Sequence, residues 1–175
     1  MIGFGRLGRR FAAKAAVLGL EMVVHDPVVS DAEIEGGGAR PRPLDELLAS
    51  CDVGSLHVPL TPGTRRLLDR RRIMSMREGA VLLNTSRGGL VDETALVDAL
   101  RSGRLGGAGL DVVESEPAAR DHPLLALSND VVTSHAAHYS LESGAQMRDR
   151  ALRNVANVLA GRPPLSAVNV GATPA

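Results

Sequence analysis

The chain has 175 residues, and 20 Lys and Arg balance 20 Asp and Glu, so its formal net charge is zero. This balance argues against binding of nucleic acid or an anionic membrane through bulk charge, and two Phe and one Tyr are too few for a stacking platform. The single cysteine, Cys51, excludes an internal disulfide and fits a reducing cytoplasm. No apolar run approaches the ~20 residues of a membrane span, and the N-terminus lacks a signal-peptide pattern. We therefore expect a cytoplasmic protein that neither enters a membrane nor binds nucleic acid directly.

The first eight residues carry a glycine pattern. Gly3, Gly5 and Gly8 fit G-x-G-x-x-G, the turn in which a strand passes into a helix beneath a pyrophosphate. The first glycine allows a tight turn, the second lets a phosphate approach bare backbone, and the third lets helix and strand pack closely. Apolar residues follow at helical spacing: Leu7, Phe11, Ala15 and Leu18. The pattern is weak alone, so the rest of the chain must supply the context of a dinucleotide site.

An acidic residue follows the next apolar run, 22–25, which ends at Asp26 as a buried parallel strand would. Asp26 lies 18 residues after Gly8, close to the spacing of roughly 20 expected for the acid that binds the adenosine ribose. Its carboxylate would accept the ribose hydroxyls and repel a 2′-phosphate. Asp26 therefore favours NAD over NADP.

The remaining chain alternates helices with short apolar strands. We expect strands at 53–58, 80–83, 107–112 and 130–133, and a mobile surface loop at 30–42. We expect helices at 44–50, in a stretch ending at Met76, from Asp92 to about 100, and over about 140–160. This alternation predicts an α/β fold with a doubly wound parallel sheet, a Rossmann domain. Residues 1–175 are expected to form a single dinucleotide-binding domain that ends in the 140–160 helix and a short tail.

Polar residues follow four of the strands, at Asp26, 85–87, 111–116 and His135. Ligands of a parallel sheet bind beyond the carboxyl ends of its strands, so these positions would border one crevice. Arg87 precedes two glycines, and its guanidinium could grip a carboxylate through two hydrogen bonds. A surface arginine beside a helix is the alternative.

His135 ends the last strand, where an imidazole can exchange a proton with an alcohol or a ketone. A structural histidine is the alternative. Glu116 opens a stretch of about fifteen residues before that strand and could orient His135, unless it and Glu114 are merely solvated. The other histidines are explained as strand-end neighbours of the cofactor (His25, His57), as loop surface (His122) or as a competitor for the same role (His138).

Several ordered motifs together resemble the nucleotide-binding domain of the D-isomer-specific 2-hydroxyacid dehydrogenases. The motifs are 3–8, 25–27, 56–62, 84–93, 109–112, 114–117 and 133–135, and the resemblance covers roughly 2–169. Within the family, the segments 114–117 and 135–140 look most like the C-terminal-binding-protein and phosphoglycerate dehydrogenase-like branch, some members of which are NAD(H)-responsive corepressors.

The resemblance implies reversible hydride transfer between NAD and carbon 2 of a 2-hydroxy acid. Arg87 would bind the substrate carboxylate, His135 would be the general acid and base, and Glu116 its partner. The residues implied to bind or line the cofactor are Gly3, Gly5, Arg6, Leu7, Gly8, Asp26, Pro59, Thr85, Ser86 and Asp111. No metal is implied, and a homodimer is expected.

The sequence departs from the family pattern at three points. A substrate-binding lobe is expected before the glycine turn, and only Met1 and Ile2 stand there, so we expect a truncated first strand and an absent lobe. Ser134 stands where the family has proline, and His138 where the C-terminal-binding branch has tryptophan. Two alternatives to an enzyme therefore stay open: an NAD(H)-sensing, corepressor-like binding module, and an inactive truncated remnant.

Overall fold

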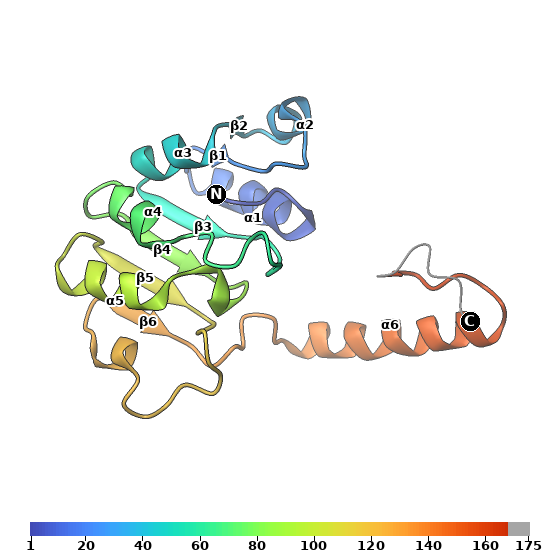
Figure 1. Cartoon of the computed structure of the whole chain (residues 1–175). Coiled ribbons are helices and arrows are strands. Elements are labelled where there is room, and N and C mark those ends of the chain that lie inside the picture. The colour runs from blue at the N-terminus through green and yellow to red at the C-terminus, as the bar shows by residue number, and fades with distance from the viewer. Residues whose placement is uncertain (168–175) are drawn as a thin grey trace. The chain divides into compact units, whose positions relative to one another are not determined.

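The computed structural model describes residues 1–167, which divide into two units, 1–135 and the residues from 136 onward (Figure 1). The first unit is built on strands β1 (Val23–Val24), β2 (Arg40–Pro41), β3 (Val53–Leu56), β4 (Val81–Asn84), β5 (Gly107–Leu110) and β6 (Asp130–Val132). Its helices are α1 (Arg6–Val17), α2 (Asp31–Gly36), α3 (Leu44–Ser50), α4 (Arg70–Ser75), η1 (Gly88–Leu90), α5 (Glu93–Arg101) and η2 (Pro123–Ala126).

The strands form two parallel ladders that a single residue joins. One ladder pairs β1 with β2, and the other runs in the order β3, β4, β5, β6. Ile2 forms parallel bridges to His25 on one side and to Leu56 on the other. Its N–H donates to the Ser55 carbonyl at 2.8 Å, and its carbonyl accepts the His57 N–H at 2.8 Å. Ile2 therefore lies between β1 and β3 and joins the two ladders, and the predicted parallel α/β fold is confirmed.

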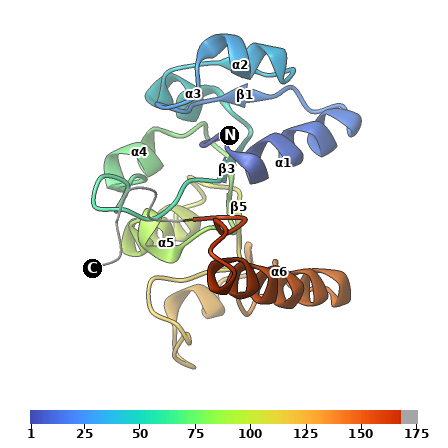
Figure 2. The ribbon, with the colours of Figure 1, turned by 90° about the vertical axis from the view of Figure 1, so that its right-hand side faces the viewer.

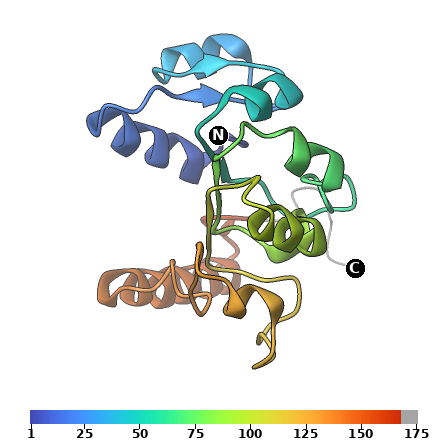
Figure 3. The same cartoon turned by 90° about the vertical axis from the view of Figure 1, so that its left-hand side faces the viewer.

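Helices cover both faces of the sheet. Figures 2 and 3 show α1 on one face and α4 and α5 on the opposite face. Helix α5 buries five aliphatic side chains against the sheet, namely Ala95, Leu96, Val97, Ala99 and Leu100. A second, smaller apolar cluster surrounds Phe4, which is 1% exposed, and includes Val24 and Ile34. The sheet is thus buried on both sides, as its continuous apolar strands require.

The expected mobile loop at 30–42 is wrong, because this segment contains α2 and β2. Ser30 caps α2 with a capping box, in which its hydroxyl accepts the Glu33 N–H and the Glu33 carboxylate accepts the Ser30 N–H. Ile34 is 1% exposed and packs in the Phe4 cluster. The run of three glycines at 36–38 favours a loop in the sequence pattern, whereas the capping box and the buried Ile34 determine the structure.

The expected helix ending at Met76 is shorter than its pattern suggests. Arg66 adopts a φ of 50°, which interrupts any helix before it, and Asp69 caps α4 by accepting the Arg72 N–H at 2.8 Å. Between these positions, Leu68 forms a parallel bridge to Val91. The segment 66–68 is therefore tied to the chain that follows Arg87.

The second unit contains helix α6 (Leu141–Leu159). Ser140 and Ser143 form a reciprocal cap at its start, since each side chain accepts the other residue's N–H, at 3.0 and 2.8 Å. Within this unit none of the helical residues is buried, and the apolar side chain of Leu152 is 71% exposed. Across residues 1–167, no helix combines the length and the apolar character that crossing a membrane requires.

Candidate functional site

The three glycines of the opening turn meet three different constraints. Gly3 has a φ of +95°, and a Cβ there would lie 2.6 Å from the carbonyl oxygen of His57. A Cβ on Gly8 would collide with the carbonyl oxygen of Gly3. At Gly5, by contrast, a Cβ would meet no heavy atom within 4 Å. The turn therefore needs glycine at two positions for its own packing and keeps open space at the third.

Helix α1 begins directly at this open space. Gly5 is its N-cap and supplies no side-chain hydrogen bond, and the first turn holds no acidic residue. The N–H groups of Arg6, Leu7 and Gly8 precede the first intrahelical hydrogen bond, which Arg9 donates to Gly5. These groups and the positive end of the helix dipole suit an anion such as a pyrophosphate.

Asp26 lies immediately beside the turn, at the end of β1. Its Oδ2 accepts the Phe4 N–H at 2.7 Å, and its Oδ1 accepts the N–H groups of Val28 and Val29 at 2.8 and 3.1 Å. Burial alone would raise the pKa of Asp26, but these three hydrogen bonds outweigh it and hold the pKa below its usual value. The carboxylate is thus ionised at neutral pH and retains lone pairs for ribose hydroxyls. Its bond to the glycine turn itself is a contact that the sequence pattern did not reveal.

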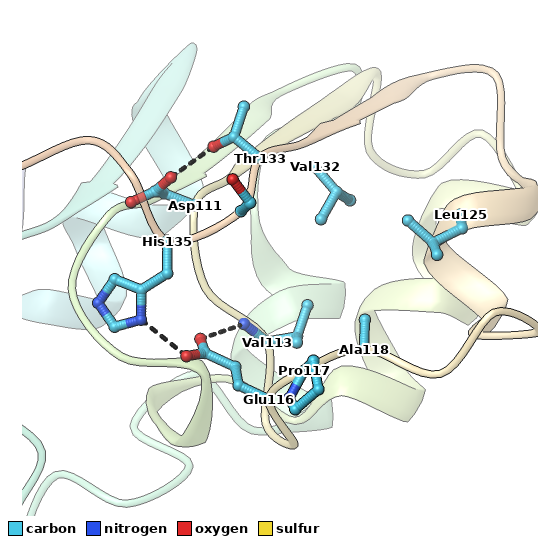
Figure 4. A pocket seen from close by; sticks show the side chains of 10 residues that line it. Asp111, Val113, Glu116, Pro117, Ala118, Leu125, Val132, Thr133 and His135 are labelled. Carbon is cyan, nitrogen blue, oxygen red and sulfur yellow. Dashed lines mark hydrogen bonds and ion pairs between the residues drawn. The ribbon is translucent and has the colours of Figure 1, made fainter. Parts of the chain in front are cut away.

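His135 and Glu116 meet beyond the carboxyl end of β6 (Figure 4). His135 Nδ1 lies 2.7 Å from Glu116 Oε2, and the other carboxylate oxygen accepts the Val113 N–H at 3.2 Å. The hydrogen bond from His135 lowers the pKa of Glu116 despite the opposing effect of burial, and the charge of Arg87 contributes. An ionised carboxylate only accepts, so Nδ1 donates in this contact, and whenever the ring carries a single proton its lone pair lies on Nε2. His135 reaches this position with a φ of 55°, in the left-handed region.

The loop carrying Arg87 packs against the loop carrying Glu116. Asn84 shapes the first loop, since its amide donates to the Arg87 carbonyl and accepts the Ser86 N–H, both at 3.0 Å. A Cβ on Gly88 would collide with the backbone of Val113, so these two chains run in direct contact. The Arg87 side chain is exposed and donates to the Ser86 carbonyl at 2.6 Å. The positive charge of Arg87 lowers the pKa of Glu116, so its guanidinium acts electrostatically on the carboxylate of the His135–Glu116 pair.

A cavity of about 510 Å³ lies beside this pair. Its polar lining comes from Asp111, Glu116, Thr133, Ser134 and His135, and its apolar lining from Val113, Pro117, Ala118, Leu125 and Val132 (Figure 4). Asp111 is 4% exposed and accepts the Thr133 hydroxyl at 2.5 Å. Sequence reasoning missed Thr133, although its place two residues before His135 at a strand end was an available signal.

The remaining predicted site residues lie along the same edge of the sheet. Thr85 and Pro59 are exposed just after β4 and β3, and the Ser86 hydroxyl donates to the Leu56 carbonyl at 2.7 Å. Because all the ladders are parallel, these strand ends face the same way as those of β1, β5 and β6. Asp26 follows β1 and His135 follows β6, so this edge has a turn end near β1, with the glycine turn, and a pair end near β6, with His135 and Glu116.

The other histidines have structural partners. His57 Nε2 lies 2.9 Å from the Ser55 hydroxyl, its ring lies 4.9 Å from that of Phe11, and burial with the nearby Met1 amino group lowers its pKa to about 4. His25 Nδ1 contacts the Arg42 carbonyl at 3.2 Å. The expectation that His122 is loop surface is wrong, because its side chain is 11% exposed and bonds to a glutamate of α5. Glu114 is 27% exposed and pairs with two arginines instead of being merely solvated, at 3.3 Å for Arg65 and 3.9 Å for Arg66.

Within residues 1–167, no three His, Cys, Asp or Glu side chains come together as metal ligands would. The arrangement offers an anion site on backbone N–H groups, a carboxylate for hydroxyls, the exposed guanidinium of Arg87, and a histidine oriented by a carboxylate.

Comparison with known proteins identifies the family. Residues 1–137 match the model of the "D-isomer specific 2-hydroxyacid dehydrogenase, NAD binding domain". A hydroxypyruvate reductase from Blautia hydrogenotrophica is 40% identical over 163 residues, which cover 93% of this chain and 50% of that protein. A D-3-phosphoglycerate dehydrogenase from Mycobacterium leprae is 41% identical over 174 residues, 97% of this chain and 32% of that protein. The chain thus spans half or less of the length of these relatives.

A solved structure extends the comparison to the cofactor. The acyclic imino acid reductase Bsp5, in complex with NADPH and D-Arg, matches with a TM-score of 0.84 and 31% identity over 93% of this chain and 50% of that one. Homologous domains therefore bind NAD or NADPH. The chain belongs to the D-isomer specific 2-hydroxyacid dehydrogenase family, and its matched part is the NAD-binding domain.

Proposed function

We propose that this chain is the cofactor-binding part of an NAD-dependent oxidoreductase that transfers a hydride between NAD(H) and a D-2-hydroxy acid or its 2-keto acid. The observation that carries the proposal is the 2.7 Å contact between His135 and Glu116 at the carboxyl end of the sheet, beside the loop of Arg87. A pure cofactor sensor would need none of these three side chains.

The cofactor would lie along the sheet edge, between the glycine turn and His135. The open space at Gly5 and the first N–H groups of α1 fit its pyrophosphate, and Asp26 fits the adenosine ribose. Thr85, Ser86, Pro59 and Asp111 would line its nicotinamide half. When bound, the nicotinamide supplies or accepts the hydride. We propose NAD over NADP, because the ionised Asp26 would repel a 2′-phosphate.

The side chains of this chain would handle the carboxylate and the proton. Arg87 binds the substrate carboxylate and helps to polarise the adjacent carbonyl. During reduction, protonated His135 gives the proton on Nε2 to the carbonyl oxygen at carbon 2, and in oxidation neutral His135 removes the hydroxyl proton. Glu116 keeps the ring oriented through Nδ1 and stabilises its charged form.

A panel of 2-keto acids with NADH tests this function, run on this chain and on any form with an upstream extension. We expect NADH oxidation with at least one 2-keto acid, and its loss in Arg87→Ala. Arg101→Ala is the matched control, because Arg101 is exposed at the far end of α5. Retention of NADH binding without turnover of any 2-keto acid would refute the enzyme function.

An NAD(H)-sensing, corepressor-like module is the alternative that the resemblance of 114–117 and 135–140 to the C-terminal-binding-protein branch supports. In that case Arg87→Ala would keep NADH-dependent dimerisation while no form of the protein turned over a 2-keto acid. An inactive remnant would bind NADH and show neither property.

We propose further that residues 1–175 work as one dinucleotide-binding domain in a cytoplasmic homodimer. The single thiol of Cys51 supports a reducing compartment. The exposed apolar residues of α6 support self-association, with Leu141 82% and Leu159 83% exposed. Light scattering of the purified chain tests this: a monomeric mass at micromolar concentration would contradict it.

A further inference from the structure

We infer that Glu93 is a positioning residue that ties both ends of the Glu116 loop to helix α5 and so keeps Glu116 aligned with His135. Its catalytic meaning rests on the proposed function, whereas the alignment itself is a property of this chain. Glu93 contacts neither member of the pair in the described hydrogen bonds, and it acts on them through the loop.

The two carboxylate oxygens of Glu93 bond to two separate points of the loop. Oε2 accepts the backbone N–H of Glu114 at 2.8 Å, and Oε1 lies 2.8 Å from Nε2 of His122. These contacts are largely removed from water, because Glu93 is 20% and His122 11% exposed. One side chain therefore fastens positions 114 and 122, and the segment 115–121 spans the distance between them.

Glu93 itself is held in a fixed position. Glu93 is the first residue of α5, where the helix dipole favours a negative charge. Asp92 caps the helix by accepting the Ala95 N–H at 3.0 Å, and the buried face of α5 fixes it to the sheet. At the C-terminal end of the loop, His122 Nδ1 accepts the N–H of the fully buried Leu124 at 3.4 Å. His122 is thereby held as the Nε2–H tautomer, the opposite of His135.

Between these points, Ala118 is the residue of the loop that packs against the apolar core. Ser115, Glu116 and Pro117 are exposed, as are 119–121. The Glu116 carboxylate forms hydrogen bonds with the Val113 N–H and with His135. Both hydrogen bonds form only while the loop keeps its position. Release of positions 114 and 122 would let Glu116 drift, and a hydrogen bond of 2.7 Å does not survive a displacement of about 1 Å. His135 would then lose the acceptor that selects its Nδ1–H tautomer.

Nitrogen-15 chemical shifts of the histidine rings test this inference on the full chain, above pH 8. In the wild type we expect His135 as the Nδ1–H tautomer and His122 as the Nε2–H tautomer. In Glu93→Ala we expect His135 to populate both tautomers. Where turnover is measurable, kcat should fall about tenfold while the KM for NADH changes less than about twofold.

Two further variants separate positioning from general damage. Glu93→Gln keeps an acceptor for the Glu114 N–H and should restore most of the Nδ1–H tautomer. Glu114→Gln removes the carboxylate that pairs with Arg65 but keeps the backbone N–H, so it should leave His135 unchanged. If Glu93→Ala does not fold, it is replaced by His122→Asn, which removes only the hydrogen bond between Glu93 and position 122. This variant should also lead His135 to populate both tautomers.

Contrary results are equally defined. A folded Glu93→Ala with the wild-type tautomer of His135, or a wild-type His135 that already samples both tautomers, overturns the inference. A wild type that binds NADH but turns over no 2-keto acid refutes only the proposed function, because the tautomer measurement still decides the role of Glu93.

Discussion

The glycine turn and the His135–Glu116 pair lie at the same edge of the sheet, yet different contacts define them. At the turn, backbone atoms set the geometry: Gly3 lies against the His57 carbonyl, and Gly8 against that of Gly3. At the pair, the side chains of His135 and Glu116 come from separate loops and meet at 2.7 Å. Glu116 lies on an exposed segment whose two ends bond to Glu93 of helix α5. We therefore expect cofactor binding and the proposed proton transfer to be separable. Changes at the turn should affect folding and NADH affinity, and changes at the pair should affect turnover.

The largest expected effect is that of Gly8→Ala. Its methyl group would collide with the Gly3 carbonyl oxygen, so we expect a loss of about 3 kcal/mol in the free energy of unfolding and no detectable NADH binding. Gly5→Ala is the matched control, because its Cβ meets no atom within 4 Å. It should fold normally and weaken NADH binding by about tenfold, by filling the approach to the backbone. Urea unfolding measures the stability of both variants, and NADH fluorescence measures their cofactor binding. Equal stability of Gly8→Ala and Gly5→Ala would contradict the conclusion that backbone packing defines the turn.

His135→Gln should lower kcat by about 10²- to 10⁴-fold, because it removes the group that we propose transfers the proton. The Kd for NADH should stay within about twofold of wild type, since the turn contacts remain intact. Stopped-flow turnover and NADH titration provide the two numbers. A variant that loses NADH affinity instead of kcat would show that the two ends are not separable.

We expect His57, which lies beside the glycine turn, to make the free energy of unfolding depend on pH. Burial lowers the pKa of His57 from 6.5 to about 4, so between these pH values the unfolded chain holds a proton there that the folded chain does not. Stability from His57 is therefore complete above pH 6.5 and is lost as the pH falls toward 4, by roughly 3 kcal/mol. Urea unfolding at several pH values measures this. His57→Gln, which can still bond to Ser55, should flatten the slope, and an unchanged slope would disprove the assignment.

The smallest effect is expected from Asp26→Asn. The amide cannot repel a 2′-phosphate, so the preference for NADH over NADPH should fall by about tenfold. Asp52→Asn, an exposed carboxylate before the amino end of β3 and thus away from the carboxyl edge of the sheet, is the control and should leave the preference unchanged. Calorimetric Kd values for both cofactors give the ratio. A wild type that binds NADPH more tightly would reverse the assignment of Asp26.

The contrast between backbone contacts at the turn and side-chain contacts at the pair also explains which features the sequence predicts. Spacing encodes backbone requirements, so G-x-G-x-x-G predicts the turn, and alternation of apolar runs predicts the parallel sheet. The expected contact of Glu116 with His135 is present, although the residues alone left a merely solvated Glu116 open, and the catalytic roles of both stay predictions. No periodicity reports the contacts of Glu93 with His122 or of Asp111 with Thr133, because each joins side chains from different elements. The structure of 30–42 was missed for another reason: its glycines outweighed a capping box that was legible in Ser30 and Glu33.

Hydride transfer is measured most directly with NADH that carries deuterium at the transferable position of C4. The complete protein is incubated with the panel of 2-keto acids, and the products are examined by mass spectrometry and NMR. We predict deuterium at carbon 2 of a D-2-hydroxy acid, and no labelled product from His135→Gln. Binding of the labelled NADH without deuterium in any product would contradict the proposed function.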